Sequence, residues 1–149
     1  MSRVQLALNV ADLDDAIDFY SKLFGTAPAK VRPGYANFAV TEPPLKLILI
    51  ADHGDPGTLN HLGVEVESRA EVGRAAARLR GEGFALRGEE GVTCCHAVQD
   101  KVFVSAPDVP HGWWEFYAVT DDNPANPDAK TTSECAVACE SQSSSACCA

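Results

Sequence analysis

The sequence predicts an α+β fold in which two βαβββ modules form one cupped sheet, followed by an irregular tail. The 149-residue chain overlaps itself when it is shifted by 56 positions, so that Gln5 falls on His61 and Gly25 on Gly81. Each copy opens with alternating apolar residues, as in a strand, and continues with helical spacing. Self-similarity at a fixed offset indicates two copies of one supersecondary unit. The modules are expected at about 2–52 and 59–119, within a domain over 1–119.

In the first module, a strand is predicted over 4–10 and a helix over 13–24. The strand places Leu6, Leu8 and Val10 on one face, opposite a face that begins with Gln5. Asp12 is a suitable N-cap for the helix and Gly25 a suitable C-terminal stop. Five apolar helix residues are expected to pack on the apolar strand face: Ala16, Phe19, Tyr20, Leu23 and Phe24. Further strands are predicted over 29–32, 35–40 and 45–51.

The second module repeats this order, with a strand over 61–66 and a helix over 70–80. Ser68 is the expected helix cap, and the helix should end at Gly81. Leu62, Val64 and Val66 form the apolar face of the strand. Three strands are predicted to follow, over 84–89, 101–105 and 113–119. The segment 91–99 is expected to be a loop or a strand edge.

Composition narrows the class of protein and its partners. The formal net charge of −9 disfavours nucleic acid and anionic membranes as partners. The hydrophobic fraction of 46% and the charged fraction of 22% are ordinary for a globular domain. The N-terminus lacks a basic segment followed by an apolar one, and no apolar run is long enough to span a bilayer. A cytoplasmic location is therefore expected.

Four of the six cysteines lie in a C-terminal tail. Beyond about Thr120 the periodicity ends, and a disordered tail is predicted over 120–149. Thiols in a reducing cytosol are available to bind soft metals rather than to form disulfides. The six cysteines comprise one central pair, Cys94 and Cys95, and four in the tail, Cys135, Cys139, Cys147 and Cys148. The tail cysteines either form an accessory thiolate cluster or are scattered along a disordered segment.

Three residues suggest a metal site where the modules meet. Gln5 and His61 occupy equivalent places in the repeat, so pseudo-symmetry should bring them close together. Glu115 lies within an aromatic strand, where a carboxylate is costly unless it is paired or bound to a cation. An imidazole, a carboxylate and an amide can bind a divalent metal. Alternatively, Gln5 is a hydrogen-bonding residue, His61 a core residue, and Glu115 the partner of a lysine or arginine.

The βαβββ repeat, with these residues on its strands, resembles the vicinal oxygen chelate superfamily, which includes glyoxalase I and extradiol dioxygenases. Four stretches resemble, within it, the group of cadmium-induced proteins and carbon–arsenic lyases. They are residues 2–10 (SRVQLALNV), 30–38 (KVRPGYANF), 59–66 (LNHLGVEV) and 93–101 (TCCHAVQDK). The last stretch is the most specific, and the resemblance covers about residues 2–119.

This resemblance implies an Fe(II) enzyme that uses dioxygen to cleave the carbon–arsenic bond of methylarsenite and related trivalent organoarsenicals, releasing arsenite in arsenical detoxification. It implies that Gln5, His61 and Glu115 hold the iron, and that Cys94 and Cys95 hold the arsenic. Trivalent arsenic is thiophilic, which agrees with that assignment. The resemblance also implies a homodimer.

The chain departs from the group at two positions. His96 follows the cysteine pair where an aromatic residue is more usual, and Phe103 stands where tryptophan is frequent. His96 is expected to be a solvent-facing loop residue, with a proton-donating role near the site as the alternative.

Two other functions remain open from the sequence. Another reaction of the superfamily, on a carbon substrate, accounts for the fold but not for Cys94 and Cys95. A binding protein that sequesters cadmium or arsenite through its thiols needs no open metal position.

Overall fold

A computed structural model describes residues 1–94 and 96–125, without the side chain of Cys94. Cys95 and residues 126–149 lie outside the described part of the chain. The disorder expected for most of the tail and the accessory role of Cys135, Cys139, Cys147 and Cys148 therefore remain predictions.

The described chain confirms the expected order of two βαβββ modules. The first contains β1 (Arg3–Val10), α1 (Leu13–Phe24), β2 (Lys30–Arg32), β3 (Tyr35–Val40) and β4 (Leu45–Ala51). The second contains β5 (Leu59–Glu65), α2 (Arg69–Gly81), β6 (Leu86–Cys94), β7 (Ala97–Ser105) and β8 (Trp113–Asp121). A single 3₁₀ turn, η1 (Pro110–Gly112), precedes β8.

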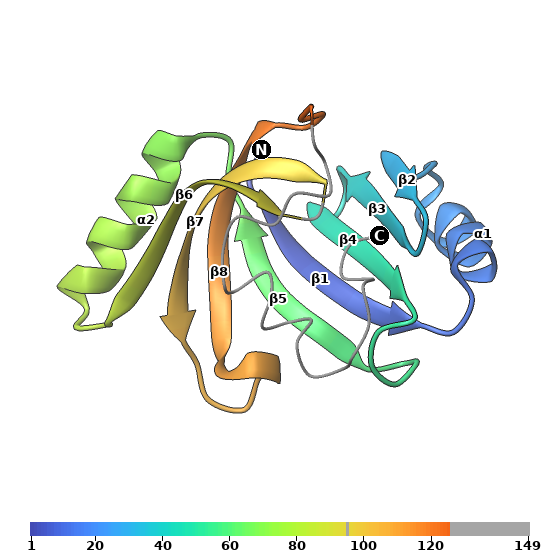
Figure 1. The fold of residues 1–149 in the computed structure, drawn as a ribbon, viewed down its shortest axis with the longest axis horizontal. Helices are drawn as coiled ribbons and strands as arrows, with labels where there is room; N and C mark the ends of the chain where they lie inside the picture. Colours follow the sequence, from blue (N-terminus) through green and yellow to red (C-terminus); the bar gives the residue numbers. More distant parts are fainter. Residues whose placement is uncertain (95, 126–149) are drawn as a thin grey trace.

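The eight strands of the described chain form one sheet in the order β2-β3-β4-β1-β5-β8-β7-β6 (Figure 1). The four strands of the second module follow those of the first in the reverse order. In each module the first strand pairs in parallel with the fourth, and the two first strands pair with each other in antiparallel orientation. Leu6 pairs with Leu62, its own counterpart in the repeat. A pseudo-twofold axis therefore passes between these two residues, at the centre of the sheet.

Helix α1 has the predicted caps. The Asp12 carboxylate accepts a hydrogen bond from the Asp15 amide, and Gly25 adopts the left-handed conformation with φ 62° that ends the helix. The packing prediction is wrong in part, because Phe19 and Leu23 are 58% and 59% exposed. The residues that face the sheet share one narrower helical stripe: Leu13, Ala16, Ile17, Tyr20 and Phe24.

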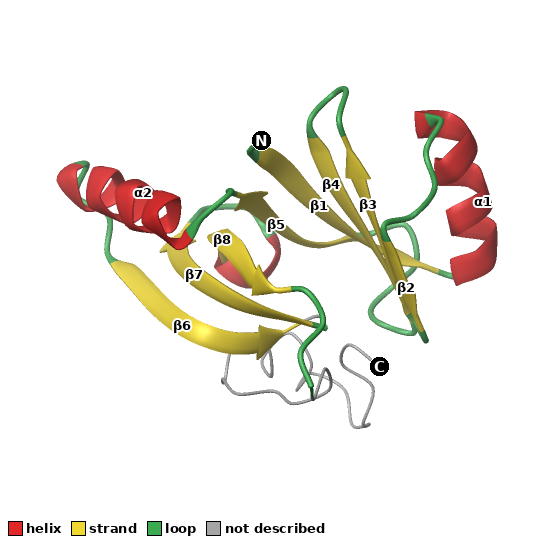
Figure 2. Ribbon diagram, turned by 90° about the horizontal axis from the view of Figure 1, so that it is seen from above, coloured by secondary structure: helices red, strands yellow, loops and turns green. Residues whose placement is uncertain are grey.

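The two helices lie on the outer side of the curved sheet, each against its own module (Figure 2). Helix α1 covers a core built around Phe38, Leu47 and Leu49, and Leu6, Leu8 and Val10 pack there as predicted. Helix α2, capped by Ser68, packs through Val72 and Ala76. The inner face of the sheet is left to line a site, with residues contributed by both modules.

Of the two alternatives for residues 91–99, the loop is wrong, whereas a strand edge agrees with the position of β6 at the end of the sheet. Residues up to Cys94 belong to β6, and β7 begins at Ala97, which pairs with Cys94 across a tight reversal. A register shift between Glu89 and Val92 coincides with Gly91 at φ 61°. The sequence lacks the usual glycine or asparagine at the reversal, where His96 instead adopts φ 63°.

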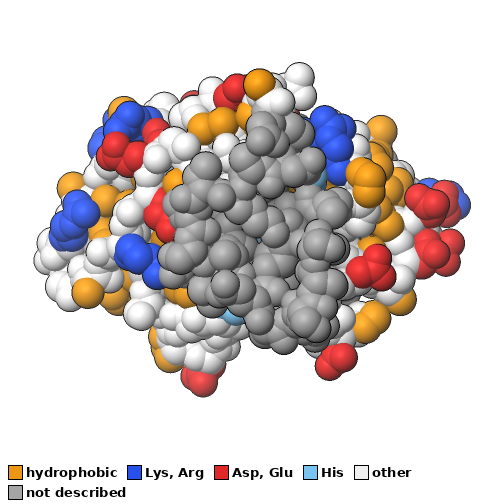
Figure 3. All heavy atoms as spheres, viewed as in Figure 1, with side chains coloured by type: hydrophobic (Ala, Val, Ile, Leu, Met, Phe, Trp, Pro, Cys, Tyr) orange, Lys and Arg blue, Asp and Glu red, His pale blue; other side chains and the backbone are white. Residues whose placement is uncertain are grey.

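No helix in the part of the chain that the structure describes combines the length and the apolar character that crossing a membrane requires. The face seen in Figure 3 carries charged side chains of both signs around its periphery.

Candidate metal centre

The candidate centre is formed by three neighbouring strands at the middle of the sheet. Gln5 on β1 pairs with Gly63 on β5, and Gly63 pairs in turn with Glu115 on β8. Side chains of paired residues project from the same face of a sheet, so Gln5 and Glu115 flank the glycine between them. His61 lies two residues before Gly63, on the same face. The structure thus brings the three predicted residues together.

Their side chains are in mutual contact and buried. The Gln5 amide Nε2 donates a hydrogen bond to Glu115 Oε1 at 2.8 Å. His61 Nε2 lies 3.6 Å from the same carboxylate oxygen. The three residues are 1%, 8% and 4% exposed, in the order Gln5, His61, Glu115. One carboxylate oxygen therefore faces both an amide and an imidazole, away from bulk water.

Gly63 is required by this arrangement. A Cβ atom at position 63 would lie 2.8 Å from Glu115 Cγ and 3.2 Å from Gln5 Nε2. Real Cβ atoms do not approach other heavy atoms at 2.8 Å, so even alanine would displace the carboxylate side chain. Because Gly63 has no side chain, the side chains of Gln5 on β1 and Glu115 on β8 can meet above this position of β5.

Lys101 on β7 provides the charge that opposes Glu115. Its Nζ donates to Glu115 Oε2 at 3.0 Å, and both side chains are buried. Burial alone would raise the pKa of Glu115, but the Lys101 ammonium and the contact with His61 outweigh burial and hold that pKa well below its usual range. Glu115 is therefore ionised at neutral pH, with Oε2 held by lysine and Oε1 directed at Gln5 and His61.

A chain of amide side chains orients His61. His61 Nδ1 lies 2.7 Å from Asn60 Oδ1, which can only accept, so Nδ1 carries a proton and donates it to Asn60. Asn60 Nδ2 donates to Asn9 Oδ1, and Asn9 Nδ2 donates to Thr58 Oγ1. This is the arrangement that fixes the tautomer of a metal-ligating histidine in many proteins.

The pseudo-twofold axis relates four positions around the centre. Gln5 corresponds to His61, and Glu115 corresponds to Ile48, because Ala7 pairs with Ile48 as Gly63 pairs with Glu115. Three of the four positions carry a polar group and the fourth is apolar. Ile48 belongs to an apolar cluster with Ala7, Tyr35 and Ile50 on the first-module side. The centre therefore has one polar side and one apolar side.

Aromatic rings border the polar side. The ring of Trp113 lies 6.0 Å from that of His61 and packs edge-on against Phe103 at 4.8 Å. The guanidinium of Arg87 covers the Phe103 ring at 4.7 Å. These rings keep the surroundings of His61 apolar and strengthen the electrostatic interactions within the centre.

The family model for the glyoxalase/bleomycin resistance protein/dioxygenase superfamily matches residues 3–123. The chain is a member of this superfamily. A trivalent organoarsenical cleaving enzyme of Thermomonospora curvata is 61% identical over 82% of this chain and 80% of its own length. The cadmium-induced protein CadI of Mycobacterium tuberculosis is 56% identical over 83% of this chain and 80% of its own length.

Solved structures support the same fold. The 2,3-dioxygenase LapB of Pseudomonas sp. KL28 superposes with a TM-score of 0.55 at 18% identity, over 89% of this chain and 47% of that protein. A Mn(II)-bound glyoxalase of Novosphingobium aromaticivorans gives a TM-score of 0.53 at 20% identity, over 79% and 40% of the two chains. At these identities the likeness concerns the fold alone.

The donor set of this superfamily member suits a divalent metal. The described residues contain no cluster of three His, Cys, Asp or Glu side chains that could hold a metal ion, so an ion at this centre would need the Gln5 amide as its third ligand. Rotation of that amide by 180° presents its oxygen in place of its nitrogen. With Lys101 on Oε2, Glu115 would offer only Oε1. One imidazole, one carboxylate and one amide leave further positions open around an ion.

Sequence reasoning missed three residues that shape the centre: Gly63, Asn60 and Lys101. The sequence allowed a lysine or arginine partner for Glu115 but did not identify which one, since Lys101 lies on another strand. The expectation for His96 is wrong. It is 3% exposed, and its ring packs edge-on against Tyr35 at 5.3 Å.

Proposed function

We propose that this protein cleaves the carbon–arsenic bond of trivalent organoarsenicals such as methylarsenite, in a reaction that depends on Fe(II) and dioxygen and releases arsenite. The observation that carries the proposal is the contact of Gln5 and His61 with one oxygen of a buried, ionised Glu115. The names of the relatives at 61% and 41% identity, a trivalent organoarsenical cleaving enzyme and a probable one, support the substrate class.

In this proposal Gln5, His61 and Glu115 hold the iron. Bound Fe(II) would supply an ion that is able to activate dioxygen beside the substrate. Asn60 holds a proton of His61 on Nδ1, which leaves Nε2 as the nitrogen for the ion, and Lys101 keeps Glu115 ionised and its second oxygen engaged. The neutral amide and imidazole leave the ion with net positive charge, since Glu115 is the single anionic ligand.

The thiols of Cys94 and Cys95 hold the arsenic in this proposal. Cys94 ends β6 on the hairpin whose other strand, β7, supplies Lys101 to the centre. Two thiolates can bind trivalent arsenic while its carbon substituent stays free. The buried cluster of Ala7, Tyr35, Ile48 and Ile50 makes the first-module side of the centre apolar, as the organic substituent requires.

The deciding experiment loads the protein with Fe(II) under anaerobic conditions, adds methylarsenite and then admits oxygen. Release of arsenite that requires both iron and oxygen supports the proposal, whereas equal release without iron contradicts it. His61→Ala and Glu115→Ala should abolish iron binding and turnover together. Gln5→Ala should weaken both less, by about tenfold, equivalent to about 1.4 kcal/mol, because a neutral amide is the weakest of the three ligands.

The thiols are tested by Cys94→Ser and Cys95→Ser. Each should retain near-normal iron stoichiometry while losing binding and cleavage of methylarsenite, because Fe(II) is satisfied by oxygen and nitrogen ligands. Metal analysis measures the iron stoichiometry, and a titration with methylarsenite measures its binding. Retention of arsenical binding in either variant would exclude the proposed role.

A second candidate is a protein that binds cadmium or another soft ion through its thiols without lyase activity. The relatives named as cadmium-induced proteins, at 56% identity, favour it. In that case Cys95→Ser should displace the soft ion, and iron and oxygen should have no effect on the fate of the arsenical.

A further inference from the structure

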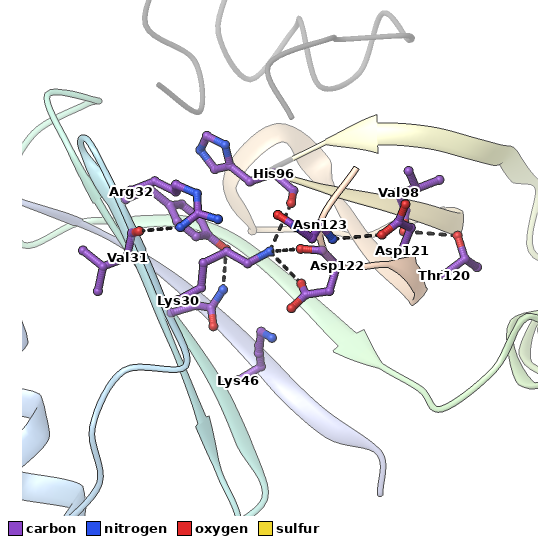
Figure 4. Close-up of polar contacts among 12 residues, drawn as sticks. Lys30, Val31, Arg32, Lys46, His96, Val98, Thr120, Asp121, Asp122 and Asn123 are labelled. Atoms are coloured by element: carbon purple, nitrogen blue, oxygen red, sulfur yellow. Dashed lines mark hydrogen bonds and ion pairs between the residues drawn. The ribbon is translucent and has the colours of Figure 1, made fainter. Parts of the chain in front are cut away.

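Lys30 joins the two ends of the sheet. It opens β2, the edge strand of the first module, while the turn between β6 and β7 belongs to the far end of the second module. Lys30 Nζ nevertheless donates to the backbone carbonyl of His96 at 3.1 Å, just beyond the end of β6 (Figure 4). It also donates to the carbonyl of Asp122 at 2.6 Å and to Asp122 Oδ1 at 2.7 Å, just after β8.

A second contact lies beside the first. The Tyr35 ring, on β3, packs edge-on against the His96 ring at 5.3 Å. Two residues from the first module therefore meet the same turn of the second module. The curved sheet is closed here by side chains rather than by a ladder of backbone hydrogen bonds.

The bonding of Lys30 is that of a structural clamp. Its ammonium has three N–H donors, and the structure supplies three acceptors. Two of these acceptors are backbone carbonyls. Lys30 therefore fixes the backbone at His96 and Asp122, in addition to pairing with the Asp122 carboxylate. The Lys30 side chain is 8% exposed, whereas in the surface pair of Lys22 with Asp18 the lysine is 75% exposed. Surface pairs of the second kind contribute little.

Symmetry does not explain this bonding. Lys30 pairs with Asn37 as Arg87 pairs with Phe103, so Arg87 is the counterpart of Lys30 in the second module. Arg87 lies over Phe103 within its own module. Lys30 instead spans the inner side of the sheet to the other module.

We propose that Lys30 is a positioning residue that fixes the turn after Cys94 relative to the Gln5–His61–Glu115 centre. The part of this inference that concerns substrate rests on the proposed function, because the turn is where the arsenic-holding thiols would lie. Removing Lys30 should loosen the turn without changing the ligands of the metal. Affinity for the organoarsenical should therefore fall while affinity for the metal is kept.

The test compares the wild-type protein with Lys30→Met and Lys30→Arg, and uses Lys22→Met as the matched control. Amide hydrogen exchange at residues 96–99 should be at least tenfold faster in Lys30→Met and unchanged at β1. KM for methylarsenite should rise about tenfold while kcat and Fe(II) affinity stay within about twofold. Lys30→Arg should recover most of the loss, because it keeps the charge and several N–H donors. Lys22→Met should match the wild type.

Two results would overturn the inference. One is wild-type exchange at residues 96–99 in Lys30→Met, and the other is a loss of metal affinity as large as the loss of substrate affinity. Should Lys30→Met fail to fold, Lys30→Gln measured in the same way decides the matter, since it keeps donors but not charge. If the wild type cleaves no organoarsenical, the proposed function fails while hydrogen exchange still decides whether Lys30 holds the turn.

Discussion

The two modules share one backbone plan but differ in what their inner faces carry. In the second module Glu115, Lys101 and Phe103 occupy three neighbouring positions on β7 and β8. By register, the first module places Ile48, Tyr35 and Asn37 at the equivalent positions. There Asn37 donates to the Tyr35 hydroxyl, and no charge is buried among these three residues. The repeat thus provides two equivalent backbone arrangements, and only the second carries buried charges at these three positions.

A buried charge requires partners and space around it. Glu115 is accommodated because Lys101, Gln5 and His61 surround it and Gly63 leaves it room. At the equivalent place in the first module Ile48 requires no such partners, and Ala7 stands where Gly63 does. The buried, ionised carboxylate of Glu115 therefore depends on five residues on four strands rather than on one position.

The largest effect is expected from making the second module resemble the first. Glu115→Ile should remove metal binding and lower the free energy of unfolding by about 3–5 kcal/mol, because it leaves the Lys101 ammonium buried without its carboxylate. Chemical denaturation and metal analysis measure the two effects. The double variant Glu115→Ile with Lys101→Met should recover most of the stability but none of the metal binding. Recovery of metal binding in the double variant would show that the ion lies elsewhere.

A fall in pH should destabilise the protein through Glu115, whose counterpart in the first module, Ile48, does not ionise. Burial alone would raise the pKa of Glu115, yet Lys101 and His61 hold the pKa well below its ordinary value of 4.5. A carboxyl group whose pKa is depressed by folding adds stability above its unfolded-state pKa and loses it as the pH falls. The metal-free wild type should therefore lose stability more steeply below about pH 4 than the Glu115→Ile, Lys101→Met variant. Parallel profiles from denaturation at several pH values would contradict this.

A smaller effect is expected at Gly63, the glycine that separates Gln5 from Glu115. Gly63→Ala places a Cβ at 2.8 Å from Glu115 Cγ, and overpacking of this kind costs about 1–3 kcal/mol. It should also weaken metal binding by displacing Glu115. Gly73→Ala is the matched control, because a Cβ there meets nothing within 4 Å and lies in helix α2. It should raise stability by up to about 1 kcal/mol, and a similar gain in Gly63→Ala would refute the packing argument.

The smallest effect is expected on the outer side of α1. Phe19→Ser should change the free energy of unfolding by no more than about 0.5 kcal/mol, because Phe19 is 58% exposed. Ile17→Ser, on the stripe that faces the sheet, should cost more, since Ile17 packs against the first-module core. Thermal unfolding of the two variants ranks them, and equal losses would place Phe19 in the core after all.

Much of this architecture could be predicted from the sequence, because the repeat fixed the order of elements and the equivalence of Gln5 and His61. Asp12, Gly25 and Ser68 marked the helix ends through local capping chemistry. The β6–β7 reversal escaped prediction because its residues lack turn chemistry. Lys101 and Lys30 escaped because the partner of Lys101 lies on another strand and the partners of Lys30 lie in the other module. A long lysine side chain can contact residues that are distant in the sequence, and such contacts produce no periodic pattern along the chain.

The pairing of β1 with β5 has a consequence for how the protein assembles. Within a module, hairpin partners such as Val40 and Leu45 are close in the chain, whereas Gln5 and Gly63 are separated by more than fifty positions. Closing a long loop costs conformational entropy before any contact offsets it. We therefore expect each half to organise first, and the centre to be completed only when the halves dock. An ion held by ligands from both halves would then stabilise the docked state over separated halves, because it binds only the assembled protein.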